Sequence, residues 1–447
     1  MTEDEKLKKA GRPQQISSSM HQFYRGKMET VPKCAVRSMD DFSVWYSPGV
    51  AAPCMDIHRE PDRVYDYTSK WNTVAVISDG SRVLGLGDIG PKAGLPVMEG
   101  KALLYKHLGG VDAVAITLDT KDPDEIIRTV LLLQPAFGGI NLEDIEQPKC
   151  FRILDTLREE AEIPVWHDDQ QGTATVTLAG LLNALKLTGR SLANSSIAFI
   201  GSGAANVACA RLIFGMGADP GACYMVDSRG ILGAHRDDIK TRRNEFPEKW
   251  ELCEATNAVG RTGGIAQAME NVDVVISLSK PEPGTIRPEW IRAMKPDPIV
   301  FACANPTPEI WPWDATEAGA AVVATGRSDF PNQVNNSLCF PAIFRGALDV
   351  RARTITDEMC FAAAQALADS VASELGPERI IPTMEERAVF PLVAAEVGMK
   401  AQEQGVARLS MSRDGLLQSA REMIERSHRL TAAMMRDGFI AEPKEEL

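Results

Sequence analysis

The segment Ser196–Arg229 restricts the possible folds of this chain more than any other stretch. An apolar run, Ile197–Ile200, ends at the glycine turn Gly201-Ser202-Gly203. An Ala-rich stretch with helical spacing follows, and a second apolar run then ends at Asp227. Strand, glycine turn, helix, strand and terminal acid in this order are typical of a βαβ unit that binds a dinucleotide.

The glycine turn and the first helical residues after it are the expected contacts of that dinucleotide. Glycines let backbone N–H groups approach a pyrophosphate at the positive end of a helix. The sequence departs from the usual pattern at its third small-residue position, which is an asparagine. We therefore expect cofactor contacts from Gly201, Gly203, Ala204, Ala205 and Asn206.

The residues at the end of the second strand bear on the choice between NAD and NADP. Asp227 can accept hydrogen bonds from a ribose diol and repels a 2′-phosphate, which favours NAD. Arg229, two residues later, could pair with a 2′-phosphate. The balance of charge predicts NAD as the cofactor and keeps NADP as the alternative.

The overall charge of the chain limits its partners. The 447 residues carry a formal net charge of −13. So acidic a protein is not expected to bind nucleic acid or an anionic membrane surface. An anionic substrate would need local cations, either a metal ion or well-placed Lys and Arg side chains.

We expect neither a secretory signal peptide nor a membrane-spanning segment. The first residues, MTEDEKLKKAGRP, have no apolar core of a signal peptide, and no apolar run reaches membrane-spanning length. The nine cysteines contain no CxxC pair, so we interpret them mainly as buried free thiols. These features predict a cytoplasmic protein.

Apolar runs alternate with helical periodicity along most of the chain, and this alternation predicts parallel α/β sheets. We expect an N-terminal α/β domain over residues 17–166 and a nucleotide-binding domain with a doubly wound parallel sheet over 167–336. In the remaining residues, 337–447, apolar side chains recur almost wholly with helical periodicity. We expect this segment to pack back on the first domain.

Two local predictions concern the surroundings of the expected sheets. Thr73–Asp79 and Arg82–Leu86 are short β-type runs joined by an Asp-Gly pair, which is a hairpin signal. Thr173 stands at the start of a strong amphipathic helical pattern, so we expect it to cap a helix there.

Two pairs of acids follow short strand-like runs. Glu143-Asp144 follows Gly139–Leu142, and Asp168-Asp169 follows Ile163–Trp166. Because a helical stretch separates the pairs, both should fall at the carboxyl ends of neighbouring parallel strands, where ligands bind. Three or four converging carboxylate oxygens suit Mg²⁺ or Mn²⁺. His167 is either a further ligand or a packed side chain.

Lys101 and Tyr46 are candidates for proton transfer. A lysine near a helix N-terminus, beside a metal and partly dry, has its ammonium form disfavoured and can act as a base. Lys92 is the rival, and spacing does not separate the two lysines. Tyr46 is either a core aromatic or a general acid. The amides of Asn305 and of Asn335-Asn336 could bind a ribose, a nicotinamide or a substrate carboxylate.

Seven ordered motifs show that the chain resembles malic enzymes of the short bacterial type. They lie between Val44 and Val350 and read YSPGVAAPC, DGSRVLGLGDIGPKAGLPVMEGKALLY, GGINLEDI, HDDQQGTA, FIGSGAANVA, CANPTPEI and VNNSLCFPAIFRGAL. Any one of them is weak evidence, whereas seven in order are highly specific.

The resemblance implies roles for individual residues. It makes Tyr46 the general acid, Lys101 rather than Lys92 the base, and Asp168 an acid that supports the lysine. The implied metal ligands are Glu143, Asp144 and Asp169. The implied substrate contacts are Arg82, Asn305, Asn336 and Asn335, and the implied cofactor contacts are Thr173, Asn305, the glycine turn and Asp227.

The activity implied by the resemblance is oxidative decarboxylation of L-malate to pyruvate and CO₂, with reduction of NAD(P)⁺ and a requirement for Mg²⁺ or Mn²⁺. The resemblance also implies a homodimer or a tetramer of dimers. Three alternatives stay open: a malolactic enzyme or another 2-hydroxy diacid dehydrogenase, an amino-acid dehydrogenase that needs no metal, and a non-catalytic nucleotide sensor.

Overall fold

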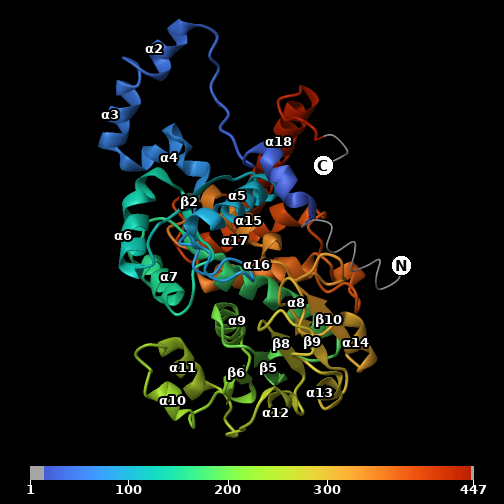
Figure 1. The fold of residues 1–447 in the computed structure, drawn as a ribbon. Helices are drawn as coiled ribbons and strands as arrows, with labels where there is room; N and C mark the ends of the chain where they lie inside the picture. Colours follow the sequence, from blue (N-terminus) through green and yellow to red (C-terminus); the bar gives the residue numbers. More distant parts are fainter. Residues whose placement is uncertain (1–14, 444–447) are drawn as a thin grey trace.

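Two β-sheets with covering helices form the body of the protein in a computed structural model that describes residues 15–443 (Figure 1). The predicted α/β class with a helical C-terminal segment is confirmed. No helix within these residues is both long and apolar enough to cross a membrane. The segment 1–13, on which the expected absence of a signal peptide depends, lies outside the described part.

The first sheet has the strand order β2-β1-β3-β4, and all its pairs are parallel. Its strands are β1 (Thr73–Ser78), β2 (Asp112–Thr117), β3 (Gly139–Leu142) and β4 (Val165–His167). Residues Val74–Ile77 of β1 are fully buried, as expected for a parallel sheet covered on both faces. Because β3 pairs with β4, the two acid pairs lie side by side, as predicted.

Three helices connect and cover these strands: α5 (Gly90–Gly109), α6 (Pro123–Leu133) and α7 (Lys149–Glu160). Asp122 caps α6, since its side chain accepts a hydrogen bond from the backbone of Asp124. Lys101 was expected near a helix start, and this expectation is wrong. The helix begins eleven residues earlier at Gly90, with Pro91 in its first turn, so Lys101 lies in its middle.

The hairpin predicted after β1 is also wrong, because Arg82–Leu86 forms no strand. The Asp-Gly pair does turn the chain, but the segment then folds on itself. The N–H of Val83 donates to the carbonyl of Gly87 at 2.9 Å. Leu84 has a φ of 49°, which lies far outside the strand region. The segment is a loop at the carboxyl edge of the sheet.

The second sheet has the order β10-β9-β8-β5-β6-β7 and is parallel except for the short strand β7. Its strands are β5 (Ile197–Ile200), β6 (Tyr224–Asp227), β7 (Gly230–Ile231), β8 (Val274–Ser277), β9 (Ile299–Ala302) and β10 (Val322–Thr325). The predicted βαβ unit is therefore confirmed as β5, α9 (Ala204–Gly215) and β6. Within the sheet, β5 lies between β8 and β6.

Helix α8 (Thr173–Leu187) leads from the first sheet into the second and packs against α9. Thr173 does not cap it, contrary to our prediction. The chain is already helical from Asp168, as a π-helical turn, η5 (Asp168–Gly172), so the backbone before Thr173 offers no open N-terminus. Short helices surround the second sheet: α10 (Asp237–Lys240), α11 (Pro247–Ala255), α12 (Ile265–Met269), α13 (Pro288–Arg292) and α14 (Pro312–Glu317).

The C-terminal helices pack against helices that cover both sheets. They are α15 (Phe340–Asp349), α16 (Asp357–Asp369), α17 (Val389–Glu403) and α18 (Arg413–Arg436). Helices α15 and α18 pack against α5 of the first sheet, while α16 packs against α8. Their apolar faces join the same large core as both sheets, which explains the helical periodicity of this part of the sequence.

A helical stretch over residues 15–24 opens the described chain, and the elements after it are short. They are η1 (Met39–Asp41), α2 (Phe42–Trp45), α3 (Ala51–Arg59), η2 (Pro61–Arg63), α4 (Val64–Tyr67) and η3 (Ser69–Asn72), which leads into β1. In Figure 1 helices α2 and α3 stand away from the body. The first buried residue of the described chain is Tyr65.

Gly346 sets the separation of α15 and α17, and its replacement tests this packing. A Cβ at this position would lie 2.3 Å from the carbonyl oxygen of Ala394. We expect Gly346→Ala to lower the free energy of unfolding by about 1–3 kcal/mol, because the helices must move apart. Thermal unfolding followed by circular dichroism measures the change.

Gly100→Ala is the matched control for this substitution. Gly100 lies in α5, and no other part of the chain comes within 4 Å of an added Cβ. Alanine is favoured over glycine in a helix by about 0.5–1 kcal/mol, so this variant should unfold at or above the wild-type temperature. If Gly346→Ala behaves like Gly100→Ala, the close contact does not limit the packing.

Candidate active site

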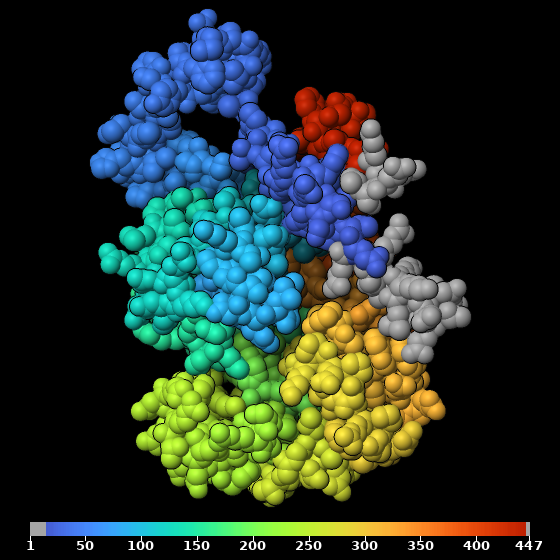
Figure 2. Space-filling view, in the orientation of Figure 1, coloured from blue at the N-terminus to red at the C-terminus, as the bar shows by residue number. Residues whose placement is uncertain are grey.

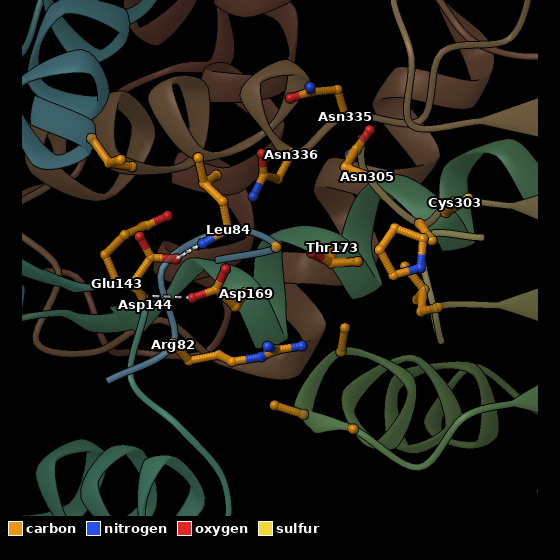
Figure 3. A pocket seen from close by; sticks show the side chains of 18 of the residues that line it. Arg82, Leu84, Glu143, Asp144, Asp169, Thr173, Cys303, Asn305, Asn335 and Asn336 are labelled. Atoms are coloured by element: carbon orange, nitrogen blue, oxygen red, sulfur yellow. Dashed lines mark hydrogen bonds between the residues drawn. The ribbon is translucent and has the colours of Figure 1, made fainter. Parts of the chain in front are cut away.

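A cavity of ≈ 920 Å³ lies between the carboxyl ends of the two sheets. This is the edge at which parallel α/β sheets bind ligands. It brings together twelve of the residues predicted from the sequence: Arg82, Lys101, Glu143, Asp144, Asp169, Thr173, Gly203, Ala204, Ala205, Asn305, Asn335 and Asn336. Figure 3 shows the acids on one side and the asparagines on the other.

Three carboxylates converge at the wall formed by the first sheet. Glu143, Asp144 and Asp169 each place one oxygen within 4.8 Å of the others'. Asp144 has a φ of 54°, a left-handed conformation that costs about 1–3 kcal/mol and is typical of functional sites. Its backbone N–H donates to the carboxylate of Asp169 at 2.8 Å, which fixes the side chain of Asp169 to the backbone of Asp144 (Figure 3).

The electrostatics of this cluster fit a divalent cation. Burial raises the pKa of Asp144 to about 8, and the neighbouring charge of Asp169 contributes. The buried Oδ2 of Asp144 has no hydrogen-bond partner among the described residues. A set of carboxylate oxygens with one unsatisfied atom suits a hard ion such as Mg²⁺ or Mn²⁺. The residues present therefore fit the predicted metal.

Asp168 and His167 do not belong to this three-carboxylate cluster. Asp168 points to Lys101, and His167 is fully buried behind the cluster, with its Nδ1 3.7 Å from Asp169. Burial lowers the pKa of His167, which favours the neutral ring. Of the two interpretations of His167 from the sequence, the packed side chain agrees with the structure.

Lys101 forms a buried ion-paired group with two acids. Its Nζ lies 2.5 Å from Asp168 and 2.9 Å from Glu143, and the ring of Phe340 lies 4.3 Å away. Burial lowers the pKa of Lys101, but the charges of Asp168 and Glu143 outweigh burial and raise it. The expectation that this site disfavours the ammonium form is therefore wrong, because the acids stabilise it.

Neighbouring side chains hold this group in place. Asp168 accepts a second hydrogen bond from the indole of Trp166 at 3.0 Å. A Cβ at Gly172 would lie 2.1 Å from the Asp168 carboxylate, so only glycine fits there. The hydroxyl of Tyr105 donates to Asn141, whose amide donates to Glu143 at 2.8 Å. The orientation of each acid is thus fixed by a buried donor.

Cations and amides surround the rest of the cavity. Arg82 extends beside Asp169 in Figure 3, where it can bind an anionic substrate group. Asn305 and Asn336 line the opposite side. The side chain of Asn335 caps the turn η8 (Asn336–Leu338) by accepting from Ser337, so part of its hydrogen-bonding capacity is used locally.

The glycine turn forms the nucleotide end of the cavity. Gly203 is the N-cap of α9, and Ala204 and Ala205 in the first turn of α9 also face the cavity. Gly201 has a φ of 101°, which favours glycine. The amide of Asn206 donates to the carbonyls of residues 200 and 201, at 2.8 and 3.0 Å. Asn206 therefore stabilises the turn from behind instead of lining the cavity.

Asp227 lies at the end of β6, as predicted, but its carboxylate is already engaged. It accepts hydrogen bonds from both terminal nitrogens of Arg236, each at 2.9 Å, and pairs with Lys249. Burial would raise the pKa of Asp227, but the hydrogen bonds from Arg236 and Lys249 outweigh burial and lower it. Arg229 is exposed and pairs with Asp238 at 3.2 Å. Neither Asp227 nor Arg229 lines the cavity.

Sequence reasoning missed Glu309, which braces the floor of the cavity. This fully buried carboxylate accepts hydrogen bonds from the hydroxyl of Ser277 at 2.7 Å and from the backbone N–H groups of Ser279 and Ala304. It thereby joins the ends of β8 and β9. Its position four residues after Asn305, in the motif CANPTPEI, was the available signal. Arg236 and Lys249 were also missed, because they are distant from Asp227 in sequence.

Within a single chain, Tyr46 lies away from the cavity. It follows α2, its side chain is 72% exposed, and it does not line the cavity. The alternative that Tyr46 is a core aromatic is therefore wrong.

The fold and the cavity together define a dinucleotide-binding α/β protein, and comparison with known proteins specifies the family. Residues 25–158 match the family model for the malic enzyme N-terminal domain, and residues 170–402 match that for the malic enzyme NAD binding domain. The chain belongs to the malic enzyme family, which confirms the resemblance seen in its motifs. Its relatives are oxidoreductases that use NAD or NADP.

Several characterised relatives are similar over most of their length. A bifunctional malic/malolactic enzyme of Bacillus subtilis (strain 168) is 48% identical over 409 residues, which cover 90% of this chain and 97% of the relative. An NAD-dependent malic enzyme of Geobacillus stearothermophilus is 49% identical over 86% of this chain and 78% of the relative. The crystal structure of Entamoeba histolytica malic enzyme aligns with a TM-score of 0.95 at 47% identity, covering 100% of this chain and 93% of that one. Family membership sets aside the amino-acid dehydrogenase and the nucleotide sensor.

Removal of one acid tests the metal site. We expect Asp169→Asn to weaken Mn²⁺ binding by at least about tenfold, because the cluster loses a charged oxygen ligand. Glu160→Gln, an exposed acid at the end of α7, is the charge-matched control and should bind as the wild type does. Isothermal titration with Mn²⁺ measures both, and equal affinities would contradict the assignment of Asp169.

Proposed function

We propose that this chain catalyses the oxidative decarboxylation of L-malate to pyruvate and CO₂ with reduction of NAD(P)⁺, and that it requires Mg²⁺ or Mn²⁺. One arrangement carries the proposal: the three-carboxylate cluster, the Lys101–Asp168 pair and the N-terminus of α9 meet at one cavity. The names of its relatives, NAD-dependent and NADP-dependent malic enzymes, support the same reaction.

Residues of both sheets would bind the reactants. Glu143, Asp144 and Asp169 would hold the divalent cation, which supplies a Lewis acid for the C1 carboxylate and C2 hydroxyl of malate. Arg82 pairs with a carboxylate of the substrate and offsets the acidity of the protein. The backbone N–H groups at the start of α9 hold the pyrophosphate of NAD(P)⁺, and Asn305 and Asn336 contact the substrate and the nicotinamide.

Lys101 and Asp168 together act as the base in this proposal. Lys101 as an ammonium ion cannot accept a proton, so its own proton must first leave. Asp168, 2.5 Å from Nζ, is placed to take that proton. The free amine then accepts the proton of the C2 hydroxyl while the hydride of C2 passes to the nicotinamide.

Decarboxylation completes the reaction. The 2-keto diacid loses its C4 carboxylate as CO₂, and the electron pair of the C3–C4 bond remains in the enolate of pyruvate. The enolate then takes one proton at C3. The proton removed from the hydroxyl and the proton added at C3 balance, so the hydride is the net reducing equivalent. The family resemblance assigns the proton donor at C3 to Tyr46, which does not line the cavity within a single chain.

A malolactic reaction is the second candidate, because the Bacillus subtilis relative is named a bifunctional malic/malolactic enzyme. In that reaction the NADH formed stays bound and reduces pyruvate to lactate. Both cofactors remain candidates as well. Arg236 and Lys249 compensate the negative charge of Asp227, so repulsion of a 2′-phosphate is weaker than the sequence alone indicated.

A coupled assay tests the function. Purified protein, L-malate and Mn²⁺ are mixed with NAD⁺ or NADP⁺, and reduced nicotinamide, pyruvate and lactate are quantified in the same samples. We expect equal amounts of reduced nicotinamide and pyruvate, and no reaction with EDTA. Lactate formed without net reduction of the cofactor would establish the malolactic reaction instead. Activity that persists with EDTA would contradict the metal requirement.

Lys101→Ala tests the proposed base. We expect kcat to fall by roughly two to four orders of magnitude, because general-base catalysis is lost, while the Kd of NAD(P)⁺ stays within about twofold of the wild-type value. Lys92→Ala is the control: Lys92 lies in the same helix but is exposed and does not line the cavity. Near-normal turnover of Lys101→Ala would refute the assignment.

A further inference from the structure

Lys280 is a cation of the cavity to which the proposed reaction gives no role. It follows β8 and lines the cavity together with its neighbours Ser279 and Pro281. Arg82 and Lys101 are the other two cations among the described lining residues. Lys101 is paired with two acids, whereas Lys280 is exposed and forms no ion pair with any described residue. Its ammonium group is therefore available for a ligand.

The segment that carries Lys280 packs directly on the glycine turn. Strands β5 and β8 are parallel neighbours, and the N–H of Leu278 donates to the carbonyl of Ile200 at 3.1 Å. A Cβ at Gly201 would lie 2.8 Å from the carbonyl oxygen of Leu278 and 3.2 Å from the Cβ of Ser279. Lys280 is the next residue, so its Cα lies about 3.8 Å from that of Ser279. This position is beside the turn at which we expect the pyrophosphate.

Hydrogen bonds fix the backbone on both sides of Lys280 and leave its side chain unengaged. Before it, the N–H of Ser279 donates to the buried carboxylate of Glu309 at 2.8 Å. After it the chain turns, and the N–H of Glu282 donates to the carbonyl of Lys280 at 2.7 Å. Figure 2 shows the yellow surface, to which the residues after β8 belong, next to the light-blue surface of the loop before α5, and residues of both line the cavity. Because the backbone is already ordered, ligand binding requires the ordering of only one side chain.

The ligand expected at this end of the cavity carries more negative charge than the glycine turn can compensate. The N-terminus of α9 acts as about half a positive charge, whereas both phosphate groups of a pyrophosphate are negative. The lining residues in the first turn of α9, Ala204 and Ala205, add no charge. The chain as a whole has a formal net charge of −13, which disfavours an anion unless a local cation offsets it. Lys280 is the cation beside the turn.

The topology of the second sheet separates Lys280 from the 2′-phosphate of NADP. Strand β5 lies between β8 and β6, so the ends of β8 and β6 are about 10 Å apart. The adenosine ribose belongs at the end of β6, beside Asp227. Lys280 lies on the other side of β5, toward β9 and Asn305. It is therefore close to the part of the dinucleotide that NAD and NADP share.

We propose that Lys280 binds the pyrophosphate of NAD(P)⁺. Its ammonium group donates to a phosphate oxygen, and the backbone N–H groups at the start of α9 bind the remaining phosphate oxygens. The contact raises the affinity for both cofactors by the same factor and does not discriminate between them. This inference rests on the nucleotide binding in the proposed function, and it does not depend on malate as the substrate.

Binding measurements with Lys280→Ala test the contact without any turnover. Isothermal titration gives the Kd of NAD⁺, of NADP⁺ and of ADP-ribose, which keeps the pyrophosphate but lacks the nicotinamide. We expect each Kd to rise by about tenfold over wild type, as for the loss of one hydrogen bond to a charged group. Lys280→Arg keeps the charge and should stay within about threefold of wild type. Lys186→Ala, at an exposed lysine of α8 that does not line the cavity, is the matched control and should bind as the wild type does.

Several results would overturn the proposal. An unchanged Kd of NAD⁺ and ADP-ribose for Lys280→Ala would remove the contact. Weaker binding of NADP⁺ alone would place the lysine at the 2′-phosphate, and a higher KM for malate with unchanged Kd values would place it at a substrate carboxylate. Wild-type protein that binds none of the three ligands would overturn this proposal together with the proposed function. Wild-type protein that binds NAD⁺ but oxidises no malate would refute only the proposed function.

Discussion

Four carboxylates and one ammonium group meet at the ends of β3 and β4, and the rest of the site depends on how their charges are balanced. Lys101 neutralises part of the excess by pairing with Asp168 and Glu143. Removal of one partner from such a buried group costs about 3–5 kcal/mol, because the remaining charge is uncompensated. The residual negative charge of Glu143, Asp144 and Asp169 is what attracts a divalent cation to this wall.

The cavity has a rigid frame because buried polar groups hold the strand ends on both sides. On the first sheet, donors from Trp166 and Asn141 orient the acids. On the second, Glu309 joins the ends of β8 and β9, and Asn206 holds the glycine turn. Neither Glu309 nor Asn206 needs to touch a ligand. They keep backbone groups in place so that little reorganisation is required when the reactants bind.

The segment 28–60 differs from this rigid frame. It has no buried residue, whereas the cavity residues are fixed by the core.

The sequence by itself determined the order of strands and helices, the βαβ unit, the acids at neighbouring strand ends and the family, because these follow from local periodicity and ordered motifs. It could not predict the loop at Arg82–Leu86 or the charged state of Lys101. These depend on contacts between residues distant in the chain, such as the pairing of Lys101 with Asp168, 67 positions later. Only the tertiary structure decided that Arg236 and Lys249 engage Asp227, and that Tyr46 lies outside the cavity of its own chain. Charge pairing and burial depend on contacts that form only in the folded chain, and no local sequence pattern encodes them.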